Sequence, residues 1–200
     1  MPRRASSLAT LCGFFLGAAA WLSAQEIEVA AVRFNNVRAP AGAAGNWLEA
    51  DVALEVKSAP PPARMVSRVQ VALTLAFELP AAAGAERRLE HYRAAAECVA
   101  LEAGRADVRF YLPPELVKRD QLHGEPKYWG VEIAVAGRAL AAGHNSYSPA
   151  LASAEARRNF AARASAAATA NDGLLQPQYL TVFAGEYPRE TPTFVRHESP

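Results

Sequence analysis

The sequence has almost no cysteine, which excludes a fold held together by disulfides. Only Cys12 and Cys98 occur in 200 residues, and Cys12 lies in a segment that we expect to be removed. Secreted chains that need covalent cross-links carry paired cysteines. We therefore expect Cys98 to be a small buried residue and the fold to depend on its apolar core.

No apolar run is long enough to be a clear transmembrane helix. Two arginines precede an apolar run from Leu8 to Leu22, and Ala24 completes a small-residue cleavage site. The run has about 15 residues, fewer than the roughly 20 that span a bilayer. This pattern predicts that residues 1–24 are a secretory signal peptide, with a membrane anchor as the alternative. The protein is then exported and is periplasmic, associated with the outer envelope or extracellular.

The expected mature chain has no excess of charge of either sign. Removing residues 1–24 takes away two arginines and no acid, which leaves 19 basic and 20 acidic residues. A chain with this balance lacks the basic surface by which proteins attract nucleic acids or anionic membranes. We therefore predict no nucleic-acid partner and no strong membrane signal after cleavage.

Familiar catalytic and metal-binding motifs are also missing. The four histidines, His91, His123, His144 and His197, lie far apart and none has a neighbour at metal-ligand spacing. No nucleophile elbow surrounds a serine, and no Gly-rich nucleotide motif follows a strand. We predict no metal, no cofactor, no catalytic residue and no enzymatic activity, although ionisable groups distant in sequence can still converge in a fold.

What the sequence has is alternation of apolar and polar residues, the period of β-strands with one buried face. The alternating runs cover residues 26–37, 48–56, 69–79, 108–112 and 129–135. In the first run the apolar parity changes near Ala30 and Ala31, which predicts a β-bulge. Turn-rich breaks separate the runs, as in an antiparallel sandwich or barrel. We predict a mainly β domain over residues 26–142.

Residues 87–103 fit either a strand or a helix. Their alanine, glutamate and leucine content favours a helix, whereas residues 89–92 and 98–101 suit a strand and Gly104 suits a hairpin turn. We predict a strand, with a helix as the open alternative. A last strand at residues 179–184 would bring the total to about seven.

The composition changes near residue 150. Ser148 suits a helix N-cap and Pro149 the first helical position, and a stretch rich in alanine and arginine follows. We predict an Ala-rich helix over residues 149–172, with a partly helical linker as the alternative. Residues 176–200 are expected to hold a possible final strand and then an extended or disordered tail.

Residues 109–135 join two of the predicted strands. Pro113 and Pro114 end the first strand, because proline cannot donate to a β-ladder. Residues 115–122 have room for about two helical turns, and Pro126 follows before the second strand. We predict a strand, a short helical crossover and a strand, which connect two sheets or cross one sheet.

This crossover also carries the candidate interaction surface. The predicted surface consists of Tyr111, Lys118, Arg119 and Tyr128. Strand parity turns both tyrosines away from the core. Leu116, Val117 and Leu122 do not share one helical stripe, so some apolar surface is expected to remain exposed beside them. Tyrosine and arginine beside apolar surface are typical of interface anchors. In the alternative interpretation, the two tyrosines only cover the outer face of a sheet.

The same region resembles a known family. The motif Phe-Tyr-Leu-Pro-Pro-Glu at residues 110–115, with residues 117–120 and 128–132, is similar to that of small secreted verrucomicrobial proteins. The resemblance implies an immunoglobulin-like antiparallel β-sandwich, associated with type IV pilus-like and secretion components. It covers about residues 26–137 and is sharp only over residues 110–135. It carries over no catalytic residue.

Two classes of function therefore stand. The first is a non-enzymatic structural or protein-interaction module of a cell-envelope assembly, with an envelope protein as partner. The second is a ligand-binding sandwich, for example for a glycan, which would use Trp47, Tyr111, Tyr128 and Trp129. A platform of coplanar exposed aromatics would favour the glycan, whereas a flat apolar patch or an unpaired sheet edge would favour protein assembly.

Overall fold

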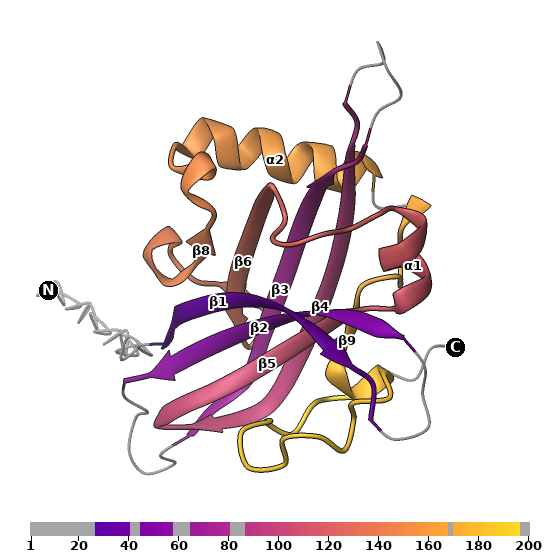
Figure 1. Cartoon of the computed structure of the whole chain (residues 1–200). Coiled ribbons are helices and arrows are strands. Elements are labelled where there is room, and N and C mark those ends of the chain that lie inside the picture. The colour runs from indigo at the N-terminus through magenta and orange to yellow at the C-terminus, as the bar shows by residue number, and fades with distance from the viewer. Residues whose placement is uncertain (1–26, 41–44, 58–64, 81–86, 168–169, 197–200) are drawn as a thin grey trace, which may run out of the picture.

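The computed structural model of the protein describes residues 27–40, 45–57, 65–80, 87–167 and 170–196 (Figure 1). The signal peptide expected at residues 1–24 lies outside these ranges. None of the helices within these ranges has the length and apolar character needed to cross a membrane.

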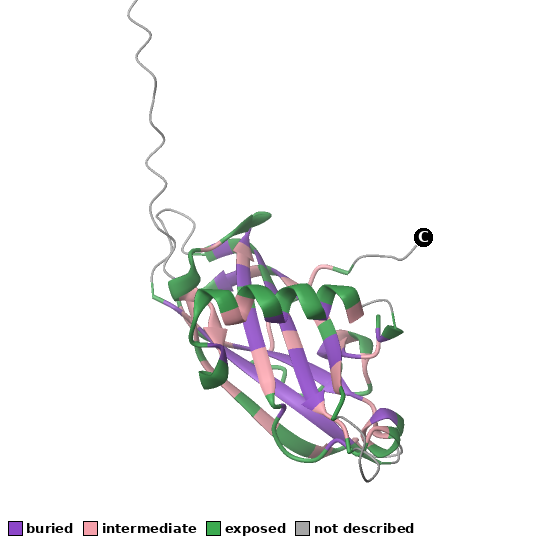
Figure 2. Cartoon of the chain, turned by 90° about the horizontal axis from the view of Figure 1, so that it is seen from above, coloured by how far each residue is buried: buried purple, intermediate pink, exposed green. Residues whose placement is uncertain are grey.

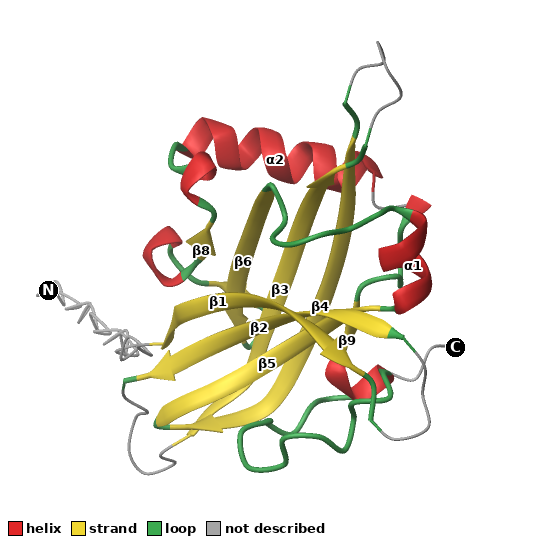
Figure 3. Cartoon of the chain, viewed as in Figure 1, coloured by secondary structure: helices red, strands yellow, loops and turns green. Residues whose placement is uncertain are grey.

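Two antiparallel sheets pack face to face, which confirms the predicted mainly β sandwich (Figure 3). Sheet A contains, in spatial order, β1 (Ile27–Arg38), β2 (Asn46–Val56), β5 (Gly104–Leu112) and β9 (Gln176–Pro177). Sheet B contains β4 (Leu89–Glu102), β3 (Met65–Glu78), β6 (Tyr128–Val135) and β7 (Arg138–Ala139). The short β8 (Ser146–Tyr147) also pairs with β6.

The connections β1–β2 and β3–β4 each join neighbouring strands of one sheet, whereas the connections β2–β3, β4–β5 and β5–β6 cross between the sheets. β2 pairs with β5 in sheet A, and β3 pairs with β6 in sheet B. In a constant-type immunoglobulin domain the fourth strand pairs with the fifth, whereas here β4 pairs with β3. Most of the ambiguous residues 87–103 form the strand β4, as predicted. This strand pairs with β3 along its whole length.

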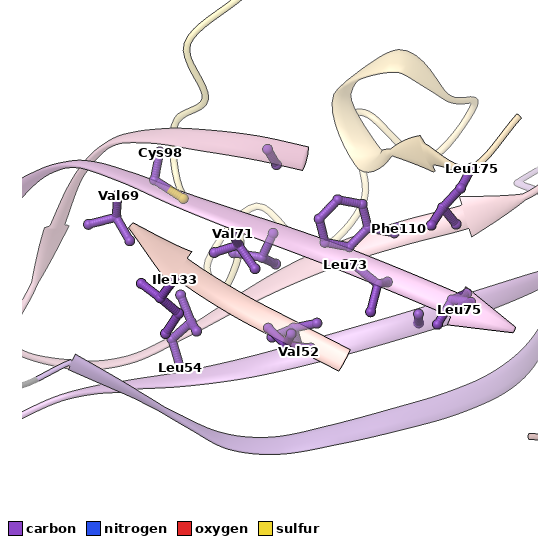
Figure 4. Packing of buried hydrophobic residues seen from close by; sticks show 14 of the residues in the cluster. Val52, Leu54, Val69, Val71, Leu73, Leu75, Cys98, Phe110, Ile133 and Leu175 are labelled. Atoms are coloured by element: carbon purple, nitrogen blue, oxygen red, sulfur yellow. The ribbon is translucent and has the colours of Figure 1, made fainter. Parts of the chain in front are cut away.

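The core lies between the sheets and is built from the alternating residues that the sequence predicted (Figure 4). Leu54 and Phe110 from sheet A pack with Leu73 and Ile133 from sheet B, and each is almost completely buried. Each such side chain stabilises the fold by about 1.5–3 kcal/mol. Cys98 lies in the same core as a free thiol, as predicted, and its burial raises the pKa of the thiol to about 12.

The predicted bulge in β1 is present. Val29 pairs with Leu54 and Ala31 with Ala53, so Ala30 is the extra residue. The pairing then continues without interruption to Arg38. The bulge reverses the strand's parity and so keeps apolar residues on the core side both before and after it.

The crossover between β5 and β6 joins the two sheets through the short helix α1 (Pro114–Arg119). The expected exposed apolar surface here is wrong, because Leu116 and Leu122 are both buried and Val117 packs against the core. The helix ends before Leu122, and the chain turns at Gln121 with a φ of 50°. Leu122 therefore does not follow the helical period.

The Ala-rich segment begins differently from the prediction. A 3-10 turn, η2 (Pro149–Leu151), comes first, and the helix α2 (Ala154–Ala167) follows. Ser153, not Ser148, caps it, since the Ala156 amide donates to the Ser153 Oγ at 3.0 Å. Figure 2 shows α2 lying across sheet B with its outward side exposed.

The predicted last strand at residues 179–184 is wrong. The strand β9 lies earlier, at residues 176–177, and a 3-10 turn, η4 (Gln178–Leu180), follows it. The buried Gln178 side chain donates to the carbonyl groups of Phe183 and Glu186 at 3.0 and 2.8 Å. These bonds curl the backbone into a compact loop, so the apolar alternation does not become a strand.

Candidate interaction surfaces

The structure does not bring the four predicted surface residues together. Tyr111 lies on the outer side of sheet A, and Tyr128 on the outer side of sheet B. Lys118 and Arg119 lie on α1, which joins the two sheets. The four residues therefore belong to three different parts of the surface.

Tyr111 points away from the sandwich core, as its parity requires, but it is completely buried. The Phe183 ring stacks on the Tyr111 ring at a centroid distance of 4.2 Å, and Trp47 meets both rings edge-on. The Tyr111 hydroxyl donates to Glu49 at 2.8 Å. Burial raises the pKa of this hydroxyl, and the bond to Glu49 raises it further. The C-terminal segment thus covers Tyr111, which cannot contact a partner in this structure.

Charged side chains continue this covered face along sheet A. Asp51 lies between Arg33 and Arg109 on the neighbouring strands, and the Arg33 guanidinium donates to it at 2.9 Å. Arg109 is buried, and its guanidinium donates to the Glu190 carboxylate at 2.8 Å. The Tyr187 ring stacks over the same guanidinium. A buried charge needs such partners to remain ionised. These contacts fix the C-terminal segment on the sheet.

Tyr128 lies beneath α2. Its ring centroid is 6.4 Å from that of Phe160, and both residues line a hollow of about 210 Å³ between α2 and sheet B. His91 lines the same hollow and is only 7% exposed. Its Nε2 has no hydrogen-bond partner in the described part of the chain. Burial lowers the pKa of His91.

Lys118 and Arg119 are both exposed on α1. The Arg119 guanidinium donates two hydrogen bonds to the adjacent Asp120 carboxylate, each 2.7 Å long. These bonds hold the pKa of Asp120 below its usual range, and a hydrogen bond from Tyr92 lowers it further. Asp120 therefore ties the end of α1 to β4. Of the predicted surface residues, Lys118 and Arg119 are the two that are exposed, whereas Tyr128 is half-buried and Tyr111 is buried.

Other parts of the chain bond to part of each of three sheet edges. On β5, β9 pairs with Phe110 and Tyr111. On β4, the Val99 amide donates to the Thr193 carbonyl at 2.8 Å and the Val195 amide to the Glu97 carbonyl at 2.7 Å. On β6, the short strands β7 and β8 pair along the outer edge. The bonded positions cannot template pairing with another chain.

The fourth edge, β1, is open. Within the described ranges β1 pairs only with β2. β1 also comes close to the 3-10 turn η1 (Ala142–His144) and to β8. The His144 Nδ1 lies 2.7 Å from the carbonyl oxygen of Ile27, the first residue of the strand. The sequence showed that β1 is a strand but not that it is an edge. The local signal was limited to the alternation around Val32 and Phe34 and to the absence of proline and lysine from residues 31–38.

The aromatic residues considered for glycan binding do not form an exposed platform. Trp47 and Tyr111 are buried beneath Phe183, Tyr128 lies under α2, and Trp129 packs against the core. In addition, no three histidine, cysteine, aspartate or glutamate side chains within the described ranges are grouped closely enough to hold a metal ion.

The comparisons with known proteins show a shared fold. No protein-family model and no curated protein matches this chain. A crystal structure of a protein from Akkermansia muciniphila superposes with a TM-score of 0.65 and 16% sequence identity, covering 88% of this chain and 96% of that chain. That source is verrucomicrobial, like the family that the crossover motif resembles. The likeness shows that the two chains share the β-sandwich fold.

Proposed function

We propose that this protein is an exported, non-enzymatic structural or protein-interaction module of a cell-envelope assembly. The observation that carries the proposal is the open edge of β1. Later segments bond to part of each of the other three edges, whereas within the described ranges no strand pairs with the outer side of β1. Unpaired edges bind the strands of other proteins.

The kind of assembly follows from the sequence motif at residues 110–135. Its resemblance to verrucomicrobial proteins associated with pilus-like and secretion components supports a partner in such a complex. Lys118 and Arg119 lie on the accessible side of this crossover. We assign them a secondary contact with the same partner, because arginine is frequent among interface anchors.

The test is retention of envelope proteins by the purified protein, identified by mass spectrometry. Asn36→Lys places a charged, flexible side chain on the open edge, where Asn36 is exposed, and lysine on an edge strand opposes pairing. Asn159→Lys makes the same change at an exposed position of α2, at the rim of the hollow near Tyr128, and serves as the matched control. We expect Asn36→Lys to lose the retained partner while Asn159→Lys keeps it.

Both variants must keep the thermal midpoint of the unchanged protein for this comparison to be valid. Equal retention by all three proteins would contradict the role of the β1 edge. A retained partner whose loss follows Arg119→Ala but not Asn36→Lys would move the interface to α1.

A further inference from the structure

We infer that residues 31–38 of β1 accept one extended strand of a partner protein, with apolar side chains at alternate positions and acidic side chains between them. This inference rests on the proposed function and specifies the partner's chemistry. The stretch is regular, since its pairing with β2 runs without a break from Ala31 to Arg38. Its eight residues exceed the usual strand length of about 5–6.

The first residues of β1 are not part of this acceptor site. The His144 side chain contacts the Ile27 carbonyl, and the bulge follows at Ala30. A bulge bends a strand and interrupts regular pairing. An added strand is therefore confined to residues 31–38.

The core side of this edge is incompletely covered. Val32 and Phe34 face the core but are only partly buried. Their partners across β2, Val52 and Ala50, are almost completely buried. The Phe34 ring lies 6.1 Å from the ring of Trp129 on the opposite sheet, and Trp129 is also only partly buried. Apolar side chains of an added strand would cover these groups, and each Å² removed from water stabilises the complex by about 25 cal/mol.

Charge on the same stretch favours an acidic partner over a second copy of this chain. Residues 31–38 contain Arg33 and Arg38 and no acid. Arg33 is already bound to Asp51, but 46% of its side chain is exposed, and Arg38 is exposed. By strand parity Arg33 lies on the outer side and Arg38 on the core side, so the acidic side chains of an alternating partner strand would face Arg33. A second copy would supply no acid for Arg33 within residues 31–38. Like charges facing each other across strands are destabilising, whereas opposite charges stabilise the pair.

The inference is tested with three eight-residue peptides added to the full protein. The first alternates valine with glutamate, the second alternates valine with lysine, and the third contains the valines and glutamates in two blocks. Amide hydrogen exchange, measured by NMR, reports which backbone groups each peptide protects. We expect the first peptide to slow exchange within residues 31–38, and the second to bind about fivefold more weakly at low salt. The blocked peptide should give no localised protection.

Other outcomes overturn the inference in recognisable ways. Equal protection by the alternating and blocked peptides would exclude strand addition, as would protection centred on another strand or no protection by any peptide. A concentration-dependent dimer that Asn36→Lys abolishes would assign the edge to a second copy. If Asn36→Lys still loses the envelope partner while no peptide protects residues 31–38, the proposed function stands and strand addition fails.

Discussion

The side chain of Leu73 is fully buried in the core, whereas its neighbour Thr74 faces the other side of β3. Removing buried methyl groups costs both transfer free energy and a cavity. We therefore expect Leu73→Ala to lower the free energy of unfolding by about 2–5 kcal/mol. Thr74→Ala should change it by less than about 1 kcal/mol. Denaturant titration measures both, and a loss below about 1 kcal/mol at Leu73 would contradict the assignment of the core face.

His91 makes a second prediction at the level of one side chain. Burial lowers its pKa in the folded protein below the ordinary value of 6.5. The unfolded chain therefore takes up this proton more readily, and stability is lost as the pH falls through 6.5 toward the lowered value. His91→Gln should remove this part of the pH dependence.

The measurement for His91 is the thermal midpoint at pH 7.5 and at pH 5. We expect the midpoint of the unchanged protein to fall further on acidification than that of His91→Gln. His123→Gln, which removes an exposed histidine from the crossover loop, is the control and should behave like the unchanged protein. An identical fall in all three would mean that other groups govern acid stability.

Among the elements, the contact of β6 with β8 and α2 depends on a glycine. A Cβ atom at Gly130 would lie 2.9 Å from Cδ1 of Tyr147, and 3.5 Å from Cε1 of Phe160. Gly130→Ala must therefore displace the Tyr147 ring, at a cost of about 1–3 kcal/mol. Gly143 has open space around the same position, so Gly143→Ala should cost much less. Denaturant titration compares the two, and equal stability would show that Tyr147 moves aside freely.

Strands and bulges that depend on the alternation of neighbouring residues could be predicted from the sequence. The parity change at Ala30 and Ala31 is visible in the sequence and became the bulge. Residues 87–103 became β4, although their composition favours helix, because cross-strand pairing outweighs helix propensity. The helix start was misplaced because Ser148 and Ser153 both resemble an N-cap, and propensity does not distinguish them.

The candidate surface was harder to predict because it depends on contacts distant in sequence. The parity of Tyr111 was predicted, but its burial comes from Phe183, 72 positions later. The compact loop after β9 depends on the hydrogen bonds of the Gln178 side chain. The alternation of apolar and polar residues gives no information about such bonds. The edge of β1 is open because β1 pairs with β2 alone in the described ranges. The alternation within one strand does not show which strands lie beside it.

Across the whole molecule, the C-terminal segment protects two sheet edges at once. β9 pairs with β5 in sheet A, and Thr193 and Val195 bond to β4 in sheet B. The same segment carries Phe183 and Glu190 onto the outer side of sheet A. β1 lies on the opposite edge of sheet A, and within the described ranges no strand pairs with its outer side.

Removing this segment should therefore convert two covered edges into adhesive ones. A chain that ends at Asp172 lacks β9, Phe183, Glu190 and the residues that bond to β4. We expect it to form larger species with rising concentration in size-exclusion chromatography with light scattering, because exposed edges pair with other chains. A chain that ends at Arg196 retains these contacts and is the matched control, which should behave like the full chain.

A gentler variant separates edge exposure from loss of folding. Val195→Pro removes the amide that donates to the Glu97 carbonyl, since proline has no backbone N–H, and leaves the rest of the chain intact. It should speed amide exchange at Val99 while the circular dichroism spectrum keeps its β character, and the Asp172-ended chain should show the same change more strongly. The prediction fails if the shorter chain stays monomeric and its Val99 amide exchanges at the rate of the full chain. Residues 173–196 would then not protect the edge of β4, and the edges of β1 and β4 would be equally open.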